Sequence, residues 1–339
     1  MAQHRVISDD PPNAGVPVAA LDGEPIGQDE MYVRCNFSLP ESLPKGFEVV
    51  VPGVAPRFVT VDELSVHRSV EAELVLECAG NGRSLMSPAP AGVAWGLDGV
   101  STIRARGVRL VDVLGPLPGE VLDVVFTGAD RGVVRSEGEI PYQFAIDREL
   151  ARSDAPILAT HIGGEPLSLL HGAPVRLLVP GQYAMKSVKW LTRIEAVTAP
   201  FEGHFMKTYR YYEDDKETEQ APVGEIAVRS VISSPVDGDT VPAGRLEVRG
   251  SAWTGSGRVA EVEVSVDDGR SWHPARWDAP PSPWAPVRWV ARVEVGPGEM
   301  VIAARASDDR GGSQPLDPRW NARGYANNVV HRVTVTSLS

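Results

Sequence analysis

The sequence is poor in cysteine and in positive charge. Its 339 residues include only two cysteines, Cys35 and Cys78, with no C-x-x-C spacing, so neither a disulfide scaffold nor a thioredoxin or zinc-ribbon motif is present. Acidic side chains (45) outnumber lysine and arginine (33), which gives a net charge of -12. This balance argues against nucleic acid or an anionic membrane as a partner, because the overall field repels phosphates. Any anion site must therefore be local.

Long hydrophobic runs and common catalytic motifs are also missing. No apolar segment approaches the ~18 residues needed to span a bilayer, and residues 1–10 (MAQHRVISDD) hold neither an apolar leader core nor a twin arginine. We therefore expect a cytoplasmic protein, or a periplasmic one if a leader has been removed. The usual nucleotide, zinc-protease and hydrolase signatures do not occur, and the seven histidines are scattered, so no local metal motif is present.

Glycine (33) and proline (29) are frequent, which favours short strands and many turns over long helices. Residues 1–28 are rich in Pro, Gly and Asp without a sustained period, which predicts an extended N-terminal arm. Residues 29–228 combine a capping box, TVDE at 60–63, with apolar strand signals at 73–78, 175–181 and 188–197. This pattern predicts an α+β domain rich in β-structure.

The chain changes character after the acidic segment 213–225. From residue 229 to 339 apolar and polar residues alternate in short segments (LEVRG, AEVEVSV, WVARVEV, VIAARA, HRVTVT), which predicts an all-β, immunoglobulin-like sandwich. Asp268-Gly269 predicts a tight hairpin after AEVEVSV. Four tryptophans lie between 272 and 289, and they either form an interface or complete the sandwich core.

Cys78 has the most informative surroundings. It ends the apolar run ELVLEC and precedes Ala-Gly-Asn-Gly-Arg-Ser, small residues that allow a bulky ligand to approach the backbone. Arg83 would favour the thiolate, which binds soft metals. Composition alone would favour a buried, inert cysteine.

The sequence motifs around Cys78 favour a metal-binding role instead. LECAGNGRS resembles the C-A-G-N-R-R motif of the sulfite oxidase family of molybdenum enzymes. Residues 32–36 (YVRCN) are similar to the family's V-R-N-H-type segment, and 171–181 (HGAPVRLLVPG) with 187–190 (SVKW) are similar to its H-G-x-P-V-R and V-K-W signature. Segments 234–241, 250–258, 265–272 and 320–324 resemble its C-terminal dimerisation domain, so the resemblance runs through residues 29–336.

This resemblance implies a molybdenum held by molybdopterin, a pyranopterin dithiolene with a phosphate tail. Cys78 would be the only protein ligand of the metal. The residues expected to hold the pterin and its phosphate are Asp130, His171, Arg176, Ser187, Val188 and Lys189 and the backbone of Tyr32, Val33, Arg34, Cys35 and Asn36. Arginine and lysine suit a phosphate, and His171 could donate from a ring nitrogen.

The resemblance also implies a substrate pocket. Its expected residues are Arg34, Arg83, Trp95, Tyr209 and Arg323. Three converging guanidinium groups would form a local anion site, which suits sulfite or another small oxyanion. The implied reaction is oxidation of sulfite to sulfate by oxygen-atom transfer, with electrons passed to an external cytochrome or to oxygen, because no haem motif occurs in the chain.

The sequence departs from the family pattern in several places. Cys35-Asn36 stands where Asn-His is frequent, Gly82 replaces the first arginine of the cysteine motif, and Phe205 replaces a frequent Trp. The tyrosine spacing is one residue short, so Tyr211 or Tyr212 could take the place of Tyr209. Cys35 is either a second thiol near the metal or a small buried residue without a role.

Other functions remain open at this stage. The family includes nitrate reductases, which tend to lose the arginine at the position of Arg323, and sulfoxide reductases, which generally lack the second domain. A cofactor-free binding protein is a further alternative from another class. The resemblance implies a homodimer that associates through the sandwich.

Overall fold

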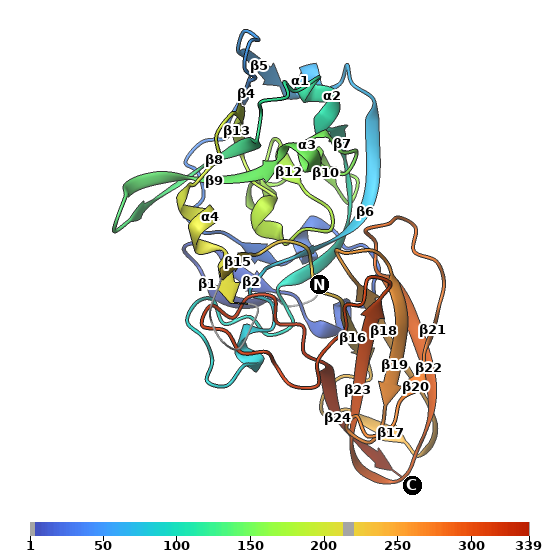
Figure 1. The fold of residues 1–339 in the computed structure, drawn as a ribbon. Helices are drawn as coiled ribbons and strands as arrows, with labels where there is room; N and C mark the ends of the chain where they lie inside the picture. The colour runs from blue at the N-terminus through green and yellow to red at the C-terminus, as the bar shows by residue number, and fades with distance from the viewer. Residues whose placement is uncertain (1–3, 213–219, 339) are drawn as a thin grey trace.

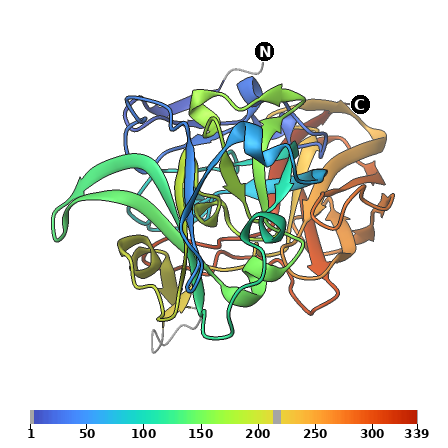
Figure 2. The same ribbon diagram turned by 90° about the horizontal axis from the view of Figure 1, so that it is seen from above.

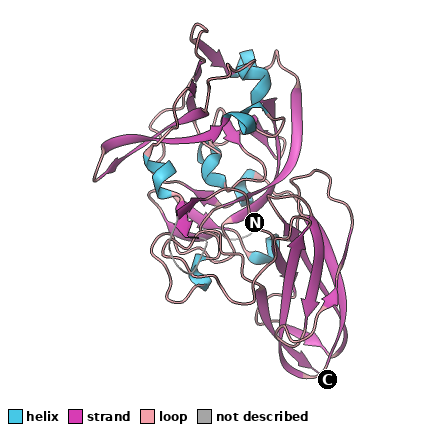
Figure 3. Cartoon of the chain, viewed as in Figure 1, coloured by secondary structure: helices cyan, strands magenta, loops and turns pink. Residues whose placement is uncertain are grey.

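The computed structural model describes residues 4–212 and 220–338, which form two lobes (Figure 1). We call the part built from strands β1 to β15 the first lobe and the part built from β16 to β24 the second lobe. Strands dominate both lobes, and the helices of the described ranges are short (Figure 3). Within these ranges no helix is long and apolar enough to cross a membrane.

Two five-stranded sheets build most of the first lobe. One has the order β11-β10-β7-β6, with β12 also paired to β10, and the other has the order β5-β4-β13-β8-β9. The first sheet contains Ser69–Glu77 (β6), Val100–Arg109 (β7), Ile157–Ile162 (β10), Glu165–Pro166 (β11) and Arg176–Leu178 (β12). The second contains Gly46–Val50 (β4), Arg57–Thr60 (β5), Asp123–Val134 (β8), Gly138–Asp147 (β9) and Leu191–Val197 (β13). The β8–β9 hairpin projects from the body of the lobe (Figure 2).

Smaller elements complete the first lobe. A two-stranded sheet pairs Arg210–Tyr212 (β14) with Gln220–Pro222 (β15). The α-helices are Val61–Leu64 (α1), Leu110–Leu114 (α2), Arg148–Arg152 (α3) and His204–Thr208 (α4). The 3-10 helices are Val18–Ala20 (η1), Gln28–Glu30 (η2), Arg83–Leu85 (η3), Leu169–His171 (η4) and Ala184–Lys186 (η5).

The capping box at 60–63 starts a helix, as its sequence predicts. The Thr60 hydroxyl accepts a hydrogen bond from the Glu63 backbone N–H, and the Glu63 carboxylate accepts one from the Thr60 backbone N–H at 2.7 Å. These bonds satisfy two donors at the start of α1 that have no partner within the helix. The apolar runs at 73–78, 175–181 and 188–197 each contain a strand, although the last begins only at Leu191.

The N-terminal arm is more regular than its composition predicts. Arg5–Ser8 (β1) and Asn13–Gly15 (β2) form a hairpin whose second strand pairs with Val33–Arg34 (β3). The Asn13 amide carbonyl lies 3.3 Å from both the Arg34 guanidinium and the Cys35 backbone N–H. Asn13 of the N-terminal arm therefore supports residues 32–36, the segment expected to hold the cofactor.

The hydrophobic core explains how β6 reaches the centre of the molecule. Val75 packs between the two large sheets with residues such as Phe126 and Ile194. Its neighbours Leu74 and Leu76 face the opposite side of their sheet. Since successive side chains alternate across a strand, the C-terminal half of β6 is buried on both faces of its sheet. This packing fixes the position of the strand end that precedes Cys78.

The second lobe is a two-layer β-sandwich. One sheet has the order β16-β18-β22-β21 and the other β17-β24-β23-β19-β20. The strands are Arg229–Ser234 (β16), Thr240–Pro242 (β17), Gly244–Trp253 (β18), Val259–Ser265 (β19), His273–Pro274 (β20), Arg276–Trp277 (β21), Val287–Val295 (β22), Gly298–Asp308 (β23) and His331–Leu338 (β24). Apolar residues from both sheets share one core, so the alternation seen in the sequence is the inward face of a sandwich.

Two expectations for the second lobe need adjustment. Asp268 and Gly269 both have positive φ, as a hairpin turn requires, yet the pairing of Val264 with His273 leaves a long connection rather than a tight two-residue turn. The Asp267 carboxylate organises that connection by accepting hydrogen bonds from the backbone N–H groups of Arg270 and Ser271. Trp289 is 2% exposed within the sandwich core, which favours the core alternative for this tryptophan.

Candidate functional site

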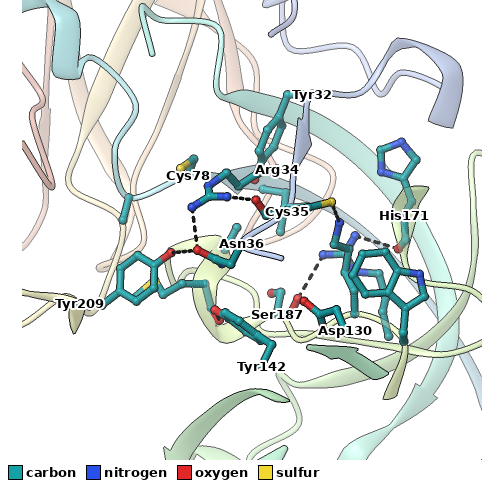
Figure 4. Close-up of a pocket in the computed structure, with 17 residues that line it drawn as sticks. Tyr32, Arg34, Cys35, Asn36, Cys78, Asp130, Tyr142, His171, Ser187 and Tyr209 are labelled. Carbon is teal, nitrogen blue, oxygen red and sulfur yellow. Dashed lines mark hydrogen bonds between the residues drawn. The ribbon is translucent and has the colours of Figure 1, made fainter. Parts of the chain in front are cut away.

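A pocket opens in the first lobe beside the end of β6, with about 650 Å³ of empty space including its mouth. Figure 4 shows that its side chains come from segments far apart in the sequence. The predicted site residues that line it are Tyr32, Arg34, Cys35, Asn36, Cys78, Asp130, His171, Arg176, Ser187, Lys189 and Tyr209.

Cys78 follows the last residue of β6 and lies in the pocket wall. Its backbone N–H donates to the Gly99 carbonyl at 2.8 Å, and its own carbonyl accepts from the Asn81 N–H at 2.9 Å in a tight turn. The side chain is buried but faces the pocket. Gly82 has a φ of 84°, a left-handed conformation that a side chain disfavours, so glycine suits this turn.

A cluster of basic groups occupies one side of the pocket. The Arg176 guanidinium is 4% exposed and donates to the carbonyls of His171 and Ser187 at 3.1 and 3.2 Å. The Lys189 ammonium donates to the Leu170 carbonyl and to the Cys35 sulfur, at 3.0 and 2.9 Å. Burial lowers the pKa of Arg176 to about 10 and also lowers that of Lys189. With a pKa of about 10, the Arg176 guanidinium remains cationic near neutral pH.

His171 differs from its expected role. Its Nε2 lies 2.9 Å from the Gln28 carbonyl, and since a carbonyl can only accept, this nitrogen carries the proton. Burial, together with Lys189 and Arg176, lowers the pKa of His171 to about 3, so the ring is neutral. Its one N–H is therefore used by Gln28 and not offered to the pocket.

Asp130 is the acidic member of this group. Burial raises its pKa to about 6, and the nearby Lys189 opposes that shift. The side chain stands at the base of the projecting β8–β9 hairpin, where the register between Thr127 and Arg131 is irregular. Such a bulge redirects side chains, and here it accompanies a carboxyl that faces the pocket.

Asn36 connects two predicted substrate residues. Its amide oxygen accepts from the Arg34 guanidinium at 2.6 Å and from the Tyr209 hydroxyl at 3.3 Å. Burial raises the pKa of Tyr209, and the Arg34 charge partly offsets this, so the phenol keeps its proton. Tyr209 lines the pocket, whereas Tyr211 lines a different depression between the lobes. The side chain of Tyr212 lies outside the described residues.

Five predicted site residues do not line the pocket. Val33 and Val188 are buried in apolar clusters. Trp95 is fully buried and packs edge-on against Tyr32, with ring centroids 6.0 Å apart. These three side chains support the pocket wall from behind rather than facing a ligand.

Arg83 and Arg323 also lie elsewhere. The Arg83 guanidinium donates to the Val93 and Arg323 carbonyls at 2.8 and 3.0 Å and lies over the Tyr325 ring. Arg323 itself has an exposed side chain and contributes its carbonyl to this contact. Gly324, with a positive φ, lies so close to Arg83 that a Cβ would meet the Arg83 side chain at 2.6 Å. The expected convergence of three guanidinium groups is therefore reduced to Arg34 in this structure.

Several lining residues were missed by sequence reasoning, namely Leu76, Ala79, Tyr142, Ala184, Met185 and Trp190. Tyr142 donates its hydroxyl to the Met185 carbonyl at 2.7 Å and stacks on Phe205 at 4.4 Å. Trp190 lies beneath the Lys189 ammonium, 4.2 Å from the ring centroid. Apolar and aromatic residues carry no chemical signal in a sequence, although Trp190 stands inside the V-K-W signature.

The donor set fits an anionic metal cofactor. Arg176 donates only to carbonyls, which do not neutralise its charge, and its Nε has no hydrogen-bond partner among the described residues. Lys189 bonds to a carbonyl and a sulfur, with the Asp130 carboxyl nearby. A buried guanidinium of this kind calls for an anion such as a phosphate. No group of three or more His, Cys, Asp or Glu residues that could hold a metal occurs within residues 4–212 and 220–338. A metal on Cys78 would thus take its other ligands from the cofactor.

Comparison with known families gives a direct match. Residues 36–205 match the oxidoreductase molybdopterin binding domain, and residues 220–338 match the Mo-co oxidoreductase dimerisation domain. The chain is 33% identical to the mitochondrial sulfite oxidase of Homo sapiens, covering 98% of this chain and 65% of that protein. It is also 33% identical to the sulfite oxidase of Gallus gallus, covering 97% of this chain and 77% of that protein.

The chain is also similar to two enzymes that are named for other activities. An NADH nitrate reductase of Oryza sativa subsp. japonica is 33% identical over 90% of this chain, which spans 37% of that enzyme. The sulfane dehydrogenase SoxCD of Paracoccus pantotrophus has the same fold, with a TM-score of 0.85, 24% identity and coverage of 99% of this chain and 88% of that one. The chain spans about two thirds of the mitochondrial relatives it matches.

Proposed function

Since the chain belongs to the sulfite oxidase family of molybdopterin oxidoreductases, we propose that it oxidises sulfite to sulfate at a molybdenum centre bound by Cys78. The observation that carries this proposal is the pocket itself. The Cys78 sulfur, the buried Arg176 guanidinium, the Lys189 ammonium and the Arg34–Asn36–Tyr209 chain all face the same space. Without a bound anion, the buried Arg176 charge would destabilise the fold.

The side chains divide into two groups in this proposal. Arg176 and Lys189 hold the cofactor phosphate, by a fork and a point charge respectively, while Cys78 binds the metal as a soft anionic donor. When bound, the cofactor supplies the two-electron chemistry of oxygen-atom transfer. Asp130, with its raised pKa, can hold a proton at its carboxyl and face pterin nitrogens.

Arg34 positions the substrate. Its guanidinium is held by Asn36 on one side and by the Asn13 amide on the other, so its charge is fixed before sulfite arrives. Such preorganised charge stabilises an anion without the energetic penalty of reorientation. Tyr209 keeps its phenolic proton, which can hydrogen-bond a substrate oxygen once the hydroxyl turns from Asn36.

A substrate panel tests this proposal. The purified, cofactor-loaded protein is assayed with sulfite and an electron-accepting dye, and with nitrate and methionine sulfoxide and a reducing dye. We expect turnover of sulfite, together with about one molybdenum per chain, because Cys78 is the one residue that this proposal assigns to the metal as a ligand. Protein that binds no molybdenum, or that turns over only another substrate, would refute the proposal.

Nitrate reduction is the second candidate. Nitrate reductases are among the relatives, and the exposed position of Arg323 removes the residue that favoured sulfite in the sequence. Nitrate and sulfite are both small oxyanions that a single guanidinium can hold. The two functions separate by the direction of electron flow in the same panel.

Other features of the whole protein belong to the same proposal. We propose a homodimer formed through the second lobe, in line with the dimerisation domain that residues 220–338 match. We also propose that the chain divides into an arm of residues 1–28, a cofactor domain of residues 29–228 and an immunoglobulin-like domain of residues 229–339. The proposed location is the cytoplasm, or the periplasm if a leader has been removed. The proposed electron acceptor is an external cytochrome or oxygen.

A further inference from the structure

We infer that the second lobe completes the metal site, because three of its residues, Arg229, Trp253 and Asn327, hold the loop that carries Cys78. This inference rests on the proposed role of Cys78 and gives the second lobe a function besides association. The residues act through Glu77 and the loop backbone, so they are positioning residues and do not touch the substrate.

Glu77 is the centre of the arrangement. It is the last residue of β6, directly before Cys78, and its side chain is fully buried. Its Oε1 accepts from the Asn81 amide at 2.9 Å and lies 3.0 Å from Arg229 Nε, and its Oε2 accepts from Trp253 Nε1 at 2.7 Å. Two of these three partners come from the second lobe, from the start of β16 and the end of β18.

The loop after Cys78 is also fixed from the second lobe. The Ala326 backbone N–H donates to the Ala79 carbonyl at 2.9 Å, and the Asn327 amide donates to the Gly82 carbonyl at 2.6 Å. Arg229 in turn donates to the Asn327 carbonyl and so supports the residue that bonds to Gly82. Residues on both sides of Cys78 are therefore bonded to the second lobe.

The chemistry of Glu77 makes this network sensitive to small changes. Each partner around its carboxylate is a donor, so a neutral amide in its place would direct its NH₂ group against another donor. Arg229 is 1% exposed, and neither charge of the pair can be solvated if the other is lost. A buried network of this kind specifies one arrangement of the groups it connects. Here that arrangement includes the backbone on which the Cys78 sulfur is mounted.

The simplest competing explanation is a purely structural bridge between the lobes. In that case, weakening the network would lower the melting temperature and leave the Cys78 environment unchanged. A measurement on the Cys78 thiol itself separates the two explanations. It also works without cofactor, so it does not depend on whether the protein oxidises sulfite.

The test uses the full chain with Cys35→Ala, purified from a host that cannot make the cofactor, so that Cys78 is the single remaining thiol. The rate of its reaction with a small thiol reagent is measured in this background and after adding Trp253→Phe. The matched control is Trp289→Phe, which truncates a buried tryptophan of the same sheet whose Nε1 has no hydrogen-bond partner among the described residues. Both changes remove the same atoms from a core.

We expect Trp253→Phe to speed the reaction of Cys78 by about tenfold, since a lost hydrogen bond to a charged group eases local opening by roughly this factor. Trp289→Phe should leave the rate unchanged, although it removes the same ring atoms from the core of the same sheet. Glu77→Gln should act like Trp253→Phe, and if that variant does not fold, Trp253→Phe decides alone. Equal rates for Trp253→Phe and Trp289→Phe would overturn the inference. A faster thiol in a protein that proves unable to bind molybdenum would refute the proposed function and, with it, the metal site, and would show only that the second lobe positions the Cys78 loop.

Discussion

Asn36 is the residue through which the account of substrate binding is tested most sharply. Its amide oxygen accepts from Arg34 at 2.6 Å and from Tyr209 at 3.3 Å. Asn36→Leu keeps the branched shape of the side chain and removes both bonds. Arg34 would then retain the Asn13 amide and the Cys35 carbonyl, both through the same nitrogen, NH1. Its NH2 would lose the partner that orients it.

The size of the effect follows from these contacts. A hydrogen bond from a charged donor contributes roughly 1.5–3 kcal/mol, and the longer Tyr209 bond between neutral groups about 1 kcal/mol at most. Because Arg34 keeps part of its support, we take the lower end, which corresponds to about a tenfold loss of kcat/KM for sulfite. Most of the loss should fall on KM, since Arg34 binds the anion in the ground state.

Steady-state turnover with sulfite and a dye measures this effect, with molybdenum content and melting temperature recorded for the same samples. Asn328→Leu is the control, because it removes an amide in the second lobe that donates to the Val228 carbonyl at 3.0 Å and lies outside the pocket. The control should leave KM for sulfite unchanged. If Asn36→Leu keeps its KM, or loses molybdenum and activity in proportion, then Asn36 does not orient Arg34 for the substrate.

Three further predictions follow from the structure. Arg323→Met should change kcat/KM for sulfite by less than about threefold, because an exposed charge contributes little; a loss above tenfold in steady-state assays would place Arg323 in the pocket after all. Burial, reinforced by Arg229 and opposed by Asp237, lowers the pKa of His331 to about 4. Between pH 6.5 and 4 only the unfolded chain takes up this proton, so the free energy of unfolding should decrease as the pH falls through that window. His331→Asn can still accept from the Ile232 N–H, and its free energy of unfolding in urea should depend less on pH than that of the wild type; an equal pH dependence would argue against this cause. Sedimentation at micromolar concentration should show a dimer, and a monomer there would contradict association through the second lobe.

The sequence predicted which chemistry the site carries better than it predicted where side chains point. Cys78, Arg176 and Lys189 could be identified because their motifs are distinctive, and all three face the pocket. Arg83 belongs to the same motif as Cys78, yet the left-handed turn at Gly82 and the approach of Gly324 direct it to backbone carbonyls. Such a direction depends on contacts across 240 positions of the chain, which no local pattern records.

A similar limit applied to the fold. Period-two alternation predicted the sandwich because one face of each strand is buried, and the capping box predicted α1 because its hydrogen bonds are local. The strands of residues 5–15 could not be predicted, since their partner is β3, and the polar composition of the segment is typical of a loop. Tyr142 was missed for a related reason, because an aromatic residue on a strand is typical of any core.

A comparison of wild-type protein with Cys78→Ser decides whether Cys78 binds the metal that performs the reaction. Wild-type protein and Cys78→Ser, both loaded in a host that makes the molybdenum cofactor and matched for bound pterin, are assayed for sulfite turnover with a dye as acceptor. We expect the variant to keep its fold and its pterin, held by Arg176 and Lys189, and to lose turnover, because a hydroxyl cannot replace the soft thiolate ligand. Near-normal turnover by Cys78→Ser would contradict the account.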